Sequence, residues 1–249
     1  MLQSKDEISN SIKLINQSLG KNKVPSKICF LGYPHFFQSS YSKLKEEGHD
    51  ISLVFPPKSD GHISDYLLNS RIFRKIYEFF YDVKHPYKLI KYEKNNNSLI
   101  NHLNSEKYDY GFHKMNSIIP QEIFNCFKYG LLNDHWSLLP FIRGRSSIEY
   151  SLVLDIPLYV TVHKVVTKMD AGSIVCIFNY DDLRFQYSSV KRIKNSIRND
   201  LPNRIVKVCQ SYGRPNFPTF RNINSLGKNY YQIHPLLTQY INLKILRKS

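Results

Sequence analysis

Cysteines and long apolar runs are scarce in this sequence. Its 249 residues include four cysteines, none of them in a Cys-x-x-Cys pair. This spacing excludes zinc-knuckle and redox motifs, and scattered thiols of this kind are typical of a reduced protein of the cytosol. No apolar run approaches the ~18–20 residues that a membrane helix needs, so we expect no membrane contact. Residues 1–27 show no apolar core or small-residue cleavage site, which excludes a secretory signal.

Acidic residues are also few, with 20 Asp and Glu against 35 Lys and Arg, a formal charge of +15. Residues 191–249 hold twelve basic residues and one acid, a net +11, and residues 1–190 hold only +4. Such a segment is typical of a surface that meets phosphates or of a solvated tail, and the charge alone favours neither. The hydrophobic share of 42% excludes a disordered chain. The length predicts one large domain, or a domain with an appendage.

The first part of the chain has the pattern of a parallel α/β sheet. Residues 1–23 carry a weak helical periodicity. The apolar run 27–31, ended by Gly32, predicts a buried strand, and a helix ending near Gly48 and a second strand at 51–55 follow it. This β-α-β order is the usual opening of an α/β domain.

The rest of the chain continues this alternation less clearly. The segment 158–165 alternates best and is the strongest strand pattern in the chain. Further strands are expected at 108–112, 129–132 and 173–178. Helices are expected at 63–80, 99–103, 120–127 and 182–209, the last interrupted at Leu201-Pro202.

A set of polar residues at the end of a predicted strand points to chemistry. Asn133 and His135 are two apart, which places both on one face of a strand, and ligands bind at the carboxyl ends of strands in such sheets. Asp170, in a loop between two predicted strands, is able to reach the same cleft. An amide and an imidazole stabilise a developing oxyanion, and an imidazole and a carboxylate move protons. Ser137 lies in no acyl-enzyme motif, so direct acyl transfer to an amine is favoured.

Four short motifs resemble the folate-dependent formyltransferases. They are Asn133-x-His135-x-Ser137-Leu-Leu-Pro140, Arg143-Gly144, Val160-Thr161-x-His163 and Asp170-x-Gly172-x-Ile174. That superfamily includes the glycinamide ribonucleotide, methionyl-tRNA and nucleotide-sugar formyltransferases. The resemblance is specific over residues 131–175 and extends more loosely back to Lys27. It implies a Rossmann-like, mostly parallel α/β domain that takes its formyl group from N10-formyltetrahydrofolate.

The resemblance also implies a mechanism. The family's catalytic Asn, His and Asp match Asn133, His135 and Asp170. The substrate amine attacks the formyl carbon directly, the amide and the imidazole stabilise the tetrahedral intermediate, and Asp170 orients His135. Whether the imidazole or the carboxylate is the net base stays open. His163 is expected to play a structural or supporting part rather than a catalytic one.

Binding residues follow from the same resemblance and from position. Folate contacts are expected at Met115, Asn116, Ile118, Thr167 and Lys168. Tyr33 and His35 follow the first strand and are expected to line the acceptor pocket. Arg143 and Arg145 suit a substrate phosphate, although a turn cap and a solvated side chain are equally consistent with them. No His, Cys and carboxylate residues have metal-ligand spacing, so we expect no metal.

We expect three segments: an N-terminal helical extension at 1–26, the formyltransferase catalytic domain at 27–190 and a basic C-terminal segment at 191–249. A nucleotide-linked amino sugar is the first choice of acceptor, because the C-terminal segment offers aromatic faces for a base and Arg or Lys for phosphates. A tRNA ranks second, since methionyl-tRNA enzymes carry a full β-barrel after the catalytic core and this segment is too short. A purine intermediate ranks third. A non-catalytic folate-, nucleotide- or RNA-binding relative and a homodimer stay open.

Overall fold

The computed structural model describes residues 5–20, 25–32, 37–55, 89–91, 96–115, 118–214 and 216–246. The expected helix at 63–80 lies outside these ranges. By its internal contacts the chain divides into two compact units, Pro25–Leu131 and Leu132–Ser249 with Met1–Val24. This division differs from the three segments expected from the sequence, whose boundaries stay a prediction.

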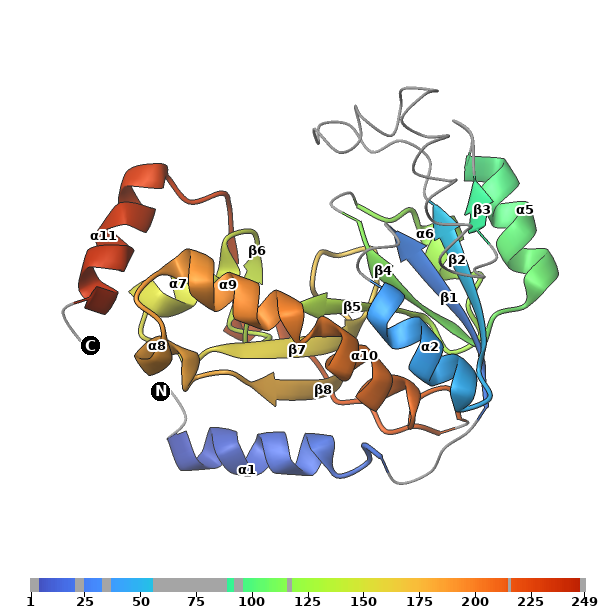
Figure 1. The fold of residues 1–249 in the computed structure, drawn as a ribbon, viewed down its shortest axis with the longest axis horizontal. Helices are drawn as coiled ribbons and strands as arrows, with labels where there is room; N and C mark the ends of the chain where they lie inside the picture. Colours follow the sequence, from blue (N-terminus) through green and yellow to red (C-terminus); the bar gives the residue numbers. More distant parts are fainter. Residues whose placement is uncertain are drawn as a thin grey trace. The chain divides into compact units, whose positions relative to one another are not determined.

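The unit of residues 25–131 is a parallel α/β layer. Its strands pair in the order β3-β2-β1-β4, and every one of these pairs is parallel (Figure 1). The expected β-α-β opening is confirmed. In chain order the elements are β1 (Lys27–Gly32), α2 (Gln38–Glu46), β2 (Asp50–Phe55), β3 (Leu89–Lys91), α5 (Asn96–Glu106), β4 (Tyr110–Lys114) and α6 (Gln121–Phe124).

Strand β4 is polar and aromatic in sequence, yet it lies in the core. Tyr110, its first residue, and Tyr108, which precedes it, are completely buried. The Tyr108 hydroxyl lies 3.2 Å from Nε2 of His102, so it has a polar partner where water is excluded. A Cβ at Gly111 would come within 2.7 Å of the Phe127 ring, so the close packing requires a glycine. The aromatic side chains are therefore core packing.

The other unit combines an antiparallel group with a helical layer. Its strands pair antiparallel in the order β5-β7-β8, and β6 and β9 form a separate parallel pair. The elements are α1 (Lys5–Asn16), β5 (Leu131–His135), β6 (Ile142–Gly144), α7 (Ser147–Val153), β7 (Tyr159–Lys164), β8 (Ile174–Asn179), α8 (Leu183–Gln186), α9 (Val190–Asn199), α10 (Leu201–Cys209), β9 (Lys228–Tyr230) and α11 (Pro235–Leu246), with a 3₁₀ turn, η2, at Asn224–Leu226.

Strand β7 separates two packed faces. Val160 packs with the apolar face of α9, which presents Val190, Ile193 and Ile197. Residues of α7 and α11 complete this cluster: Ile148, Leu152, Ile241 and Ile245. The opposite face of β7 carries Tyr159, which packs with residues that follow β5. That second face is the one on which the candidate site lies.

Helix α1 covers the edge of the antiparallel group (Figure 1). Ile12 and Ile15 pack against the cluster that contains Tyr159 and Ile177. The Asn16 side chain accepts the backbone N–H of Ile177 at 3.0 Å and donates to its carbonyl at 2.6 Å. These bonds satisfy backbone groups that an edge strand otherwise leaves open to another chain. The N-terminal extension thus contributes to the packing of this unit.

The basic segment after residue 190 is largely built into the same unit. The interruption expected at Leu201-Pro202 is observed, because Pro202 lies at the start of α10. Val190, Ile197, Ile205 and Val208 are buried on the two helices. In the described ranges, no helix is both long enough and apolar enough to span a membrane.

Candidate active site

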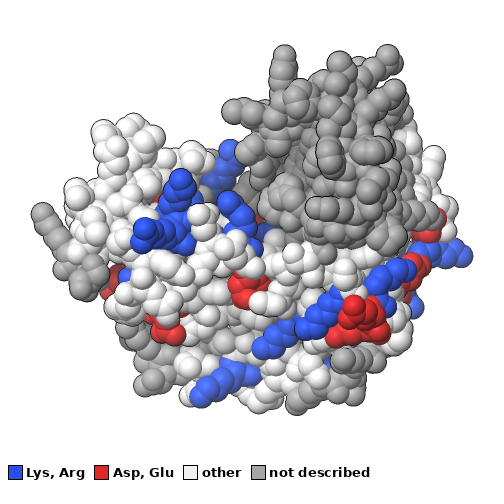
Figure 2. All heavy atoms as spheres, in the orientation of Figure 1, with Lys and Arg blue, Asp and Glu red and all other residues white. Residues whose placement is uncertain are grey.

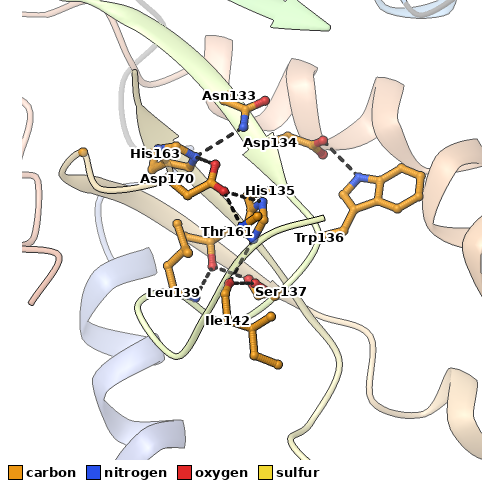
Figure 3. A network of polar contacts seen from close by, with 12 residues as sticks. Asn133, Asp134, His135, Trp136, Ser137, Leu139, Ile142, Thr161, His163 and Asp170 are labelled. Atoms are coloured by element: carbon orange, nitrogen blue, oxygen red, sulfur yellow. Dashed lines mark hydrogen bonds and ion pairs between the residues drawn. The ribbon is translucent and has the colours of Figure 1, made fainter. Parts of the chain in front are cut away.

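Strand β5 presents alternate side chains to opposite faces. Asn133 and His135 lie opposite His163 and Thr161 of β7 in the antiparallel register. Asp134, between them in sequence, points the other way (Figure 3). The structure therefore has the shared face for Asn133 and His135 that their spacing predicted.

The buried His135 ring has a defined orientation. Its Nε2 lies 3.0 Å from the carbonyl oxygen of Ile142. Because a carbonyl only accepts, we assign the proton to Nε2, which donates to it. The Ser137 hydroxyl donates to the same oxygen at 2.5 Å. Nδ1 is then the nitrogen that faces Asp170, at 3.5 Å from Oδ2.

A turn after β7 presents Asp170 to both histidines. The residue has a left-handed backbone, with φ at +49°. Its Oδ2 accepts the backbone N–H of Gly144 at 2.8 Å. Its Oδ1 lies 3.5 Å from Nε2 of His163 (Figure 3). One carboxylate thus contacts a backbone amide and two imidazoles.

Burial and charge set the protonation states of this pair. Burial lowers the pKa of His135 from its ordinary 6.5, and the nearby Asp170 carboxylate opposes this only in part. Burial raises the pKa of Asp170, but His135, His163 and the Gly144 N–H outweigh it and hold that pKa well below 3.8. At neutral pH the site therefore pairs a neutral imidazole with a carboxylate. The Nδ1 lone pair of His135 is available to accept a proton, and the carboxylate stabilises the imidazolium that results.

His163 connects the other members of the cluster. Its Nδ1 lies 2.8 Å from the carbonyl of Lys164, so that nitrogen donates. The other ring nitrogen, Nε2, lies 3.3 Å from the Asn133 amide nitrogen and 3.5 Å from Oδ1 of Asp170. His163 thus contacts both Asn133 and Asp170, which fits the supporting role expected from the sequence.

Thr161 fixes the turn that follows β5. Its hydroxyl donates to the carbonyl of Ser137 at 2.7 Å and accepts the N–H of Leu139 at 3.2 Å. This turn leads to Ile142, whose carbonyl holds the His135 ring. The Ser-Leu-Leu-Pro motif therefore serves to orient the imidazole.

A buried ion pair anchors the opposite face of β5. Arg204 of α10 donates to Oδ2 of Asp134 from Nε at 2.9 Å and from Nη2 at 2.6 Å. Both side chains are 1% exposed. The Trp136 indole, half-buried against the apolar cluster, donates to Oδ1 of Asp134 at 3.1 Å. Sequence reasoning missed this pair, because a separation of 70 residues leaves no local signal.

The expected folate contacts fall into three groups. Asn116 lies outside the described residues. Met115 and Ile118 belong to the unit of residues 25–131, and Ile118 is 77% exposed. Thr167 and Lys168 are exposed in the loop between β7 and β8 of the other unit. Their assignment to a folate site stays a prediction.

The expected acceptor contacts also differ in their surroundings. Tyr33 and His35 lie outside the described residues. Arg143 is buried, and its Nη2 donates to the carbonyl of Gly227 at 2.8 Å, so part of its guanidinium holds local backbone. Arg145 is exposed, and its backbone N–H donates to the Tyr230 carbonyl at 2.9 Å. Phosphate binding by either arginine stays a prediction.

Metal ligands are not gathered in the part of the chain that the structure describes. There, no three His, Cys, Asp or Glu side chains are grouped so that they could hold an ion. All four cysteines are free thiols. The polar groups described at the site are an amide, two imidazoles and a carboxylate, which suit oxyanion stabilisation and proton transfer.

A comparison with protein families decides the assignment. The model of the formyl transferase family matches residues 26–208. The chain belongs to the formyl transferase family. The match includes Asn133, His135 and Asp170, and it extends through most of α10 into the basic segment.

The chain is similar in sequence to methionyl-tRNA formyltransferases. The enzyme of Rickettsia bellii (strain RML369-C) is 32% identical over 162 residues, which are 62% of this chain and 50% of that protein. The enzyme of Rickettsia massiliae (strain Mtu5) is 30% identical over 164 residues, again 62% and 50%. The chain therefore spans about half the length of the curated relatives it matches.

Solved structures of similar fold include several formyltransferases. A 4-N formyltransferase from Francisella tularensis has a TM-score of 0.61 at 17% identity, covering 88% of this chain and 87% of that one. A sugar N-formyltransferase from Shewanella sp FDAARGOS_354 has a TM-score of 0.58 at 13% identity, covering 89% and 88%. HypX from Aquifex aeolicus in complex with tetrahydrofolic acid has a TM-score of 0.55 at 15% identity, covering 86% and 31%. These similarities show the Rossmann-like, mostly parallel α/β fold of formyltransferases.

Proposed function

We propose that this formyl transferase family member moves the formyl group of N10-formyltetrahydrofolate to an amine. The observation that carries the proposal is the cluster of Asn133, His135 and Asp170, in which a neutral imidazole faces a carboxylate at 3.5 Å. The HypX structure contains tetrahydrofolic acid, which supports a folate as the donor. The donor brings a formyl carbon on an amide nitrogen, and its attack by a neutral amine needs oxyanion stabilisation and a proton acceptor.

The described side chains match these two needs. As the amine nitrogen bonds to the formyl carbon, the Asn133 amide donates to the oxygen that gains negative charge. His135 takes the amine proton at Nδ1, and Asp170 stabilises the imidazolium. When the bond between the formyl carbon and N10 breaks, the imidazolium returns that proton to N10. The proton is then conserved, and no covalent enzyme intermediate is required.

The proposed folate contacts are those that the family resemblance implies: Met115, Asn116 and Ile118, and Thr167 and Lys168. Hydrophobic and backbone groups of exposed loops suit a flat pterin ring, and Ile118 is 77% exposed. No step of the transfer depends on the side-chain chemistry of these residues. Their substitution is expected to raise the KM for the folate more than it lowers kcat.

A nucleotide-linked amino sugar is the proposed acceptor. The structural similarity to the Shewanella sugar N-formyltransferase covers 89% of this chain and 88% of that enzyme. It therefore includes most of the C-terminal segment. That segment places Tyr230 on the ring of Tyr150, with centroids 4.4 Å apart, and Tyr231 is 82% exposed. Exposed aromatic faces stack nucleotide bases.

A methionyl-tRNA is the second candidate, and two observations favour it. The curated relatives of highest printed identity, 30–32%, are methionyl-tRNA formyltransferases. The net +11 of residues 191–249 also suits a polyanion. The two candidates differ in the size of the acceptor and share the chemistry at His135.

The test is formyl transfer by the purified protein. N10-formyltetrahydrofolate is incubated with dTDP-, UDP- and GDP-linked amino sugars or with methionyl-tRNA, and the release of tetrahydrofolate is followed together with the mass of the product. Release with an amino sugar, and its loss in His135→Gln, is the expected result. Transfer to methionyl-tRNA alone would establish the second candidate, and no transfer to any amine would exclude the proposed activity.

A further inference from the structure

Asn222, from the basic C-terminal segment, contacts the turn that presents Asp170. Its side-chain nitrogen donates to the carbonyl of Asp170 at 2.9 Å and to the carbonyl of Gly172 at 3.1 Å. The residue is 6% exposed. Nothing in the local sequence around Asn222 indicates this contact, which spans 52 residues.

These contacts require the amide of Asn222. Two carbonyl oxygens are acceptors only, so the NH₂ group must face them, and its two hydrogens serve both. The Oδ1 atom is buried without a hydrogen-bond partner among the described residues. Burying an amide oxygen without a hydrogen-bond partner destabilises the folded state. The two hydrogen bonds that the amide nitrogen donates offset this destabilisation.

The turn that Asn222 holds is closely packed. Asp170 has φ at +49°, a conformation that a non-glycine residue rarely adopts without support. A Cβ at Gly172 would lie 1.8 Å from the carbonyl of Lys164, so the turn lies directly on the end of β7. Ile174 and Phe220 exchange backbone hydrogen bonds of 2.8 Å in each direction. The chain around Asn222 is therefore fixed beside the turn.

The C-terminal segment also packs against Gly144, the residue whose N–H binds the Asp170 carboxylate. Gly144, whose N–H donates to Oδ2 of Asp170, lies in β6, and β6 pairs with β9 of the C-terminal segment. A Cβ at Gly144 would lie 2.3 Å from the Tyr230 carbonyl, so β9 passes directly over it. The C-terminal segment thus supports Asp170 in two ways: Asn222 holds its backbone, and β9 pairs with the strand whose Gly144 N–H donates to its carboxylate.

We propose that Asn222 is a positioning residue that keeps the Asp170 carboxylate within reach of His135. The inference rests on the proposed function for its effect on catalysis, although the effect on His135 is independent of any substrate. Without the two donors, the left-handed turn relaxes and the carboxylate moves away from the imidazole. A displacement of about 1 Å in a catalytic group costs roughly 10²-fold in rate.

The test compares Asn222→Leu, which keeps the volume and removes both donors, with Asn222→Ala, which removes both donors in a smaller side chain; neither adds a charge beside Asp170. Asn195→Leu, an exposed position on α9, is the matched control. The ¹⁵N NMR titration of His135, assigned with His135→Gln, is expected to show a lower pKa in both Asn222 variants, because Asp170 no longer supports the imidazolium. The other titratable groups that act on His135 are His163 and Asp134, and the hydrogen bonds of the Asn222 side chain go to neither of them.

Kinetics supply the second readout. Both Asn222 variants are expected to lose about 10- to 100-fold in kcat with a KM within twofold of wild type, while Asn195→Leu keeps both values. An unchanged kcat, or a lower kcat with an unchanged His135 titration, would overturn the proposal. If Asn222→Leu fails to fold, as judged by circular dichroism, Asn222→Ala decides. If the wild type transfers no formyl group, the proposed function fails and the titration alone decides the positioning role.

Discussion

At the scale of residues, the site depends on a histidine that is kept neutral in a buried position. Burial alone lowers the pKa of His135, and the contact with Asp170 limits that effect. A base with a pKa below neutrality is already deprotonated at pH 7, so it is ready to take a proton. The carboxylate 3.5 Å away stabilises the charged ring only after the proton arrives. The pair therefore favours the transition state over the resting state.

This argument predicts the pH dependence of transfer. The rate of the wild type is expected to rise with pH through the pKa of His135, with its midpoint below pH 6.5, the ordinary value for histidine. His135→Gln is expected to lose about 10²–10⁴-fold in kcat/KM and to give a flat profile. His234→Gln, at an exposed position, is the control. A His135→Gln enzyme of near-native rate would contradict the catalytic assignment.

The lowered pKa of Asp170 predicts how the free energy of unfolding depends on pH. Its folded pKa is depressed, so the stability that it contributes is present above about pH 3.8 and is lost as pH falls below that value. Asp170→Asn is expected to lower the melting temperature at pH 7 by roughly 3–12 °C. The difference from wild type should shrink below pH 3.8, as scanning calorimetry would show. Asp182→Asn, at an exposed site, should give no such convergence.

The sequence predicted part of this site for physical reasons. Asn133 and His135 were placed on one face because strand side chains alternate, and that face is observed. Asp170 was associated with them through the resemblance and its place in a loop. Asn222 was missed because it acts through backbone carbonyls, which leave no residue pattern.

At the scale of elements, β5 is held from both sides. One face carries the site, and the other carries the ion pair of Asp134 with Arg204. The Arg204 Nη1 also donates to the Tyr180 hydroxyl and to the carbonyl of Ile197, each at 2.8 Å. The guanidinium therefore joins β5 to the end of α9 and to the end of β8. A strand fixed in this way keeps Asn133 in register with β7.

The buried ion pair predicts that substitutions of Asp134 and Arg204 have strongly non-additive effects on the free energy of unfolding. Arg204→Met leaves the Asp134 carboxylate buried without its cation and is expected to cost about 3–5 kcal/mol. Replacement of both residues, as Asp134→Leu with Arg204→Met, is expected to cost less than that single substitution, because no charge is left buried. Urea unfolding of the single and double variants measures the coupling. Strictly additive costs would contradict it.

The elements that the sequence missed lack periodic patterns. Strands β6 and β9 have three residues each, too short for alternation to be recognised. Helix α11 is apolar on nearly every side: Ile241 and Ile245 are buried, while Leu236, Tyr240 and Leu243 are exposed. A helix without a polar face carries no amphipathic signal. Strands β1 and β2 of the parallel unit were found because their apolar runs are continuous, whereas β3, with three residues, was missed.

At the scale of the whole molecule, the charge of +15 is less uniform than its total suggests. Within the C-terminal segment, Arg204 forms a buried ion pair with Asp134, and Lys194 forms an ion pair with the buried Glu149, so neither charge is free to meet a ligand. On the face drawn in Figure 2, Lys and Arg side chains form separate groups, with acidic side chains beside some of them. Such a distribution suits the proposed acceptor, whose few phosphates need only a small group of cations.

Ligand protection of the folded state tests this view of the acceptor. A ligand that binds the native chain at 100 times its Kd stabilises it by about 2.7 kcal/mol, which raises the melting temperature. We expect dTDP, UDP or GDP to give such a shift at millimolar concentration, with Arg145→Ala reducing it, because a diphosphate needs only a small group of cations. A tRNA covers many phosphates, so its protection would fall steeply with added salt, whereas that of a diphosphate would fall less. Protection by tRNA alone, with no effect of any nucleoside diphosphate, would reverse the ranking of the two acceptors, since the basic segment would then serve an extended polyanion.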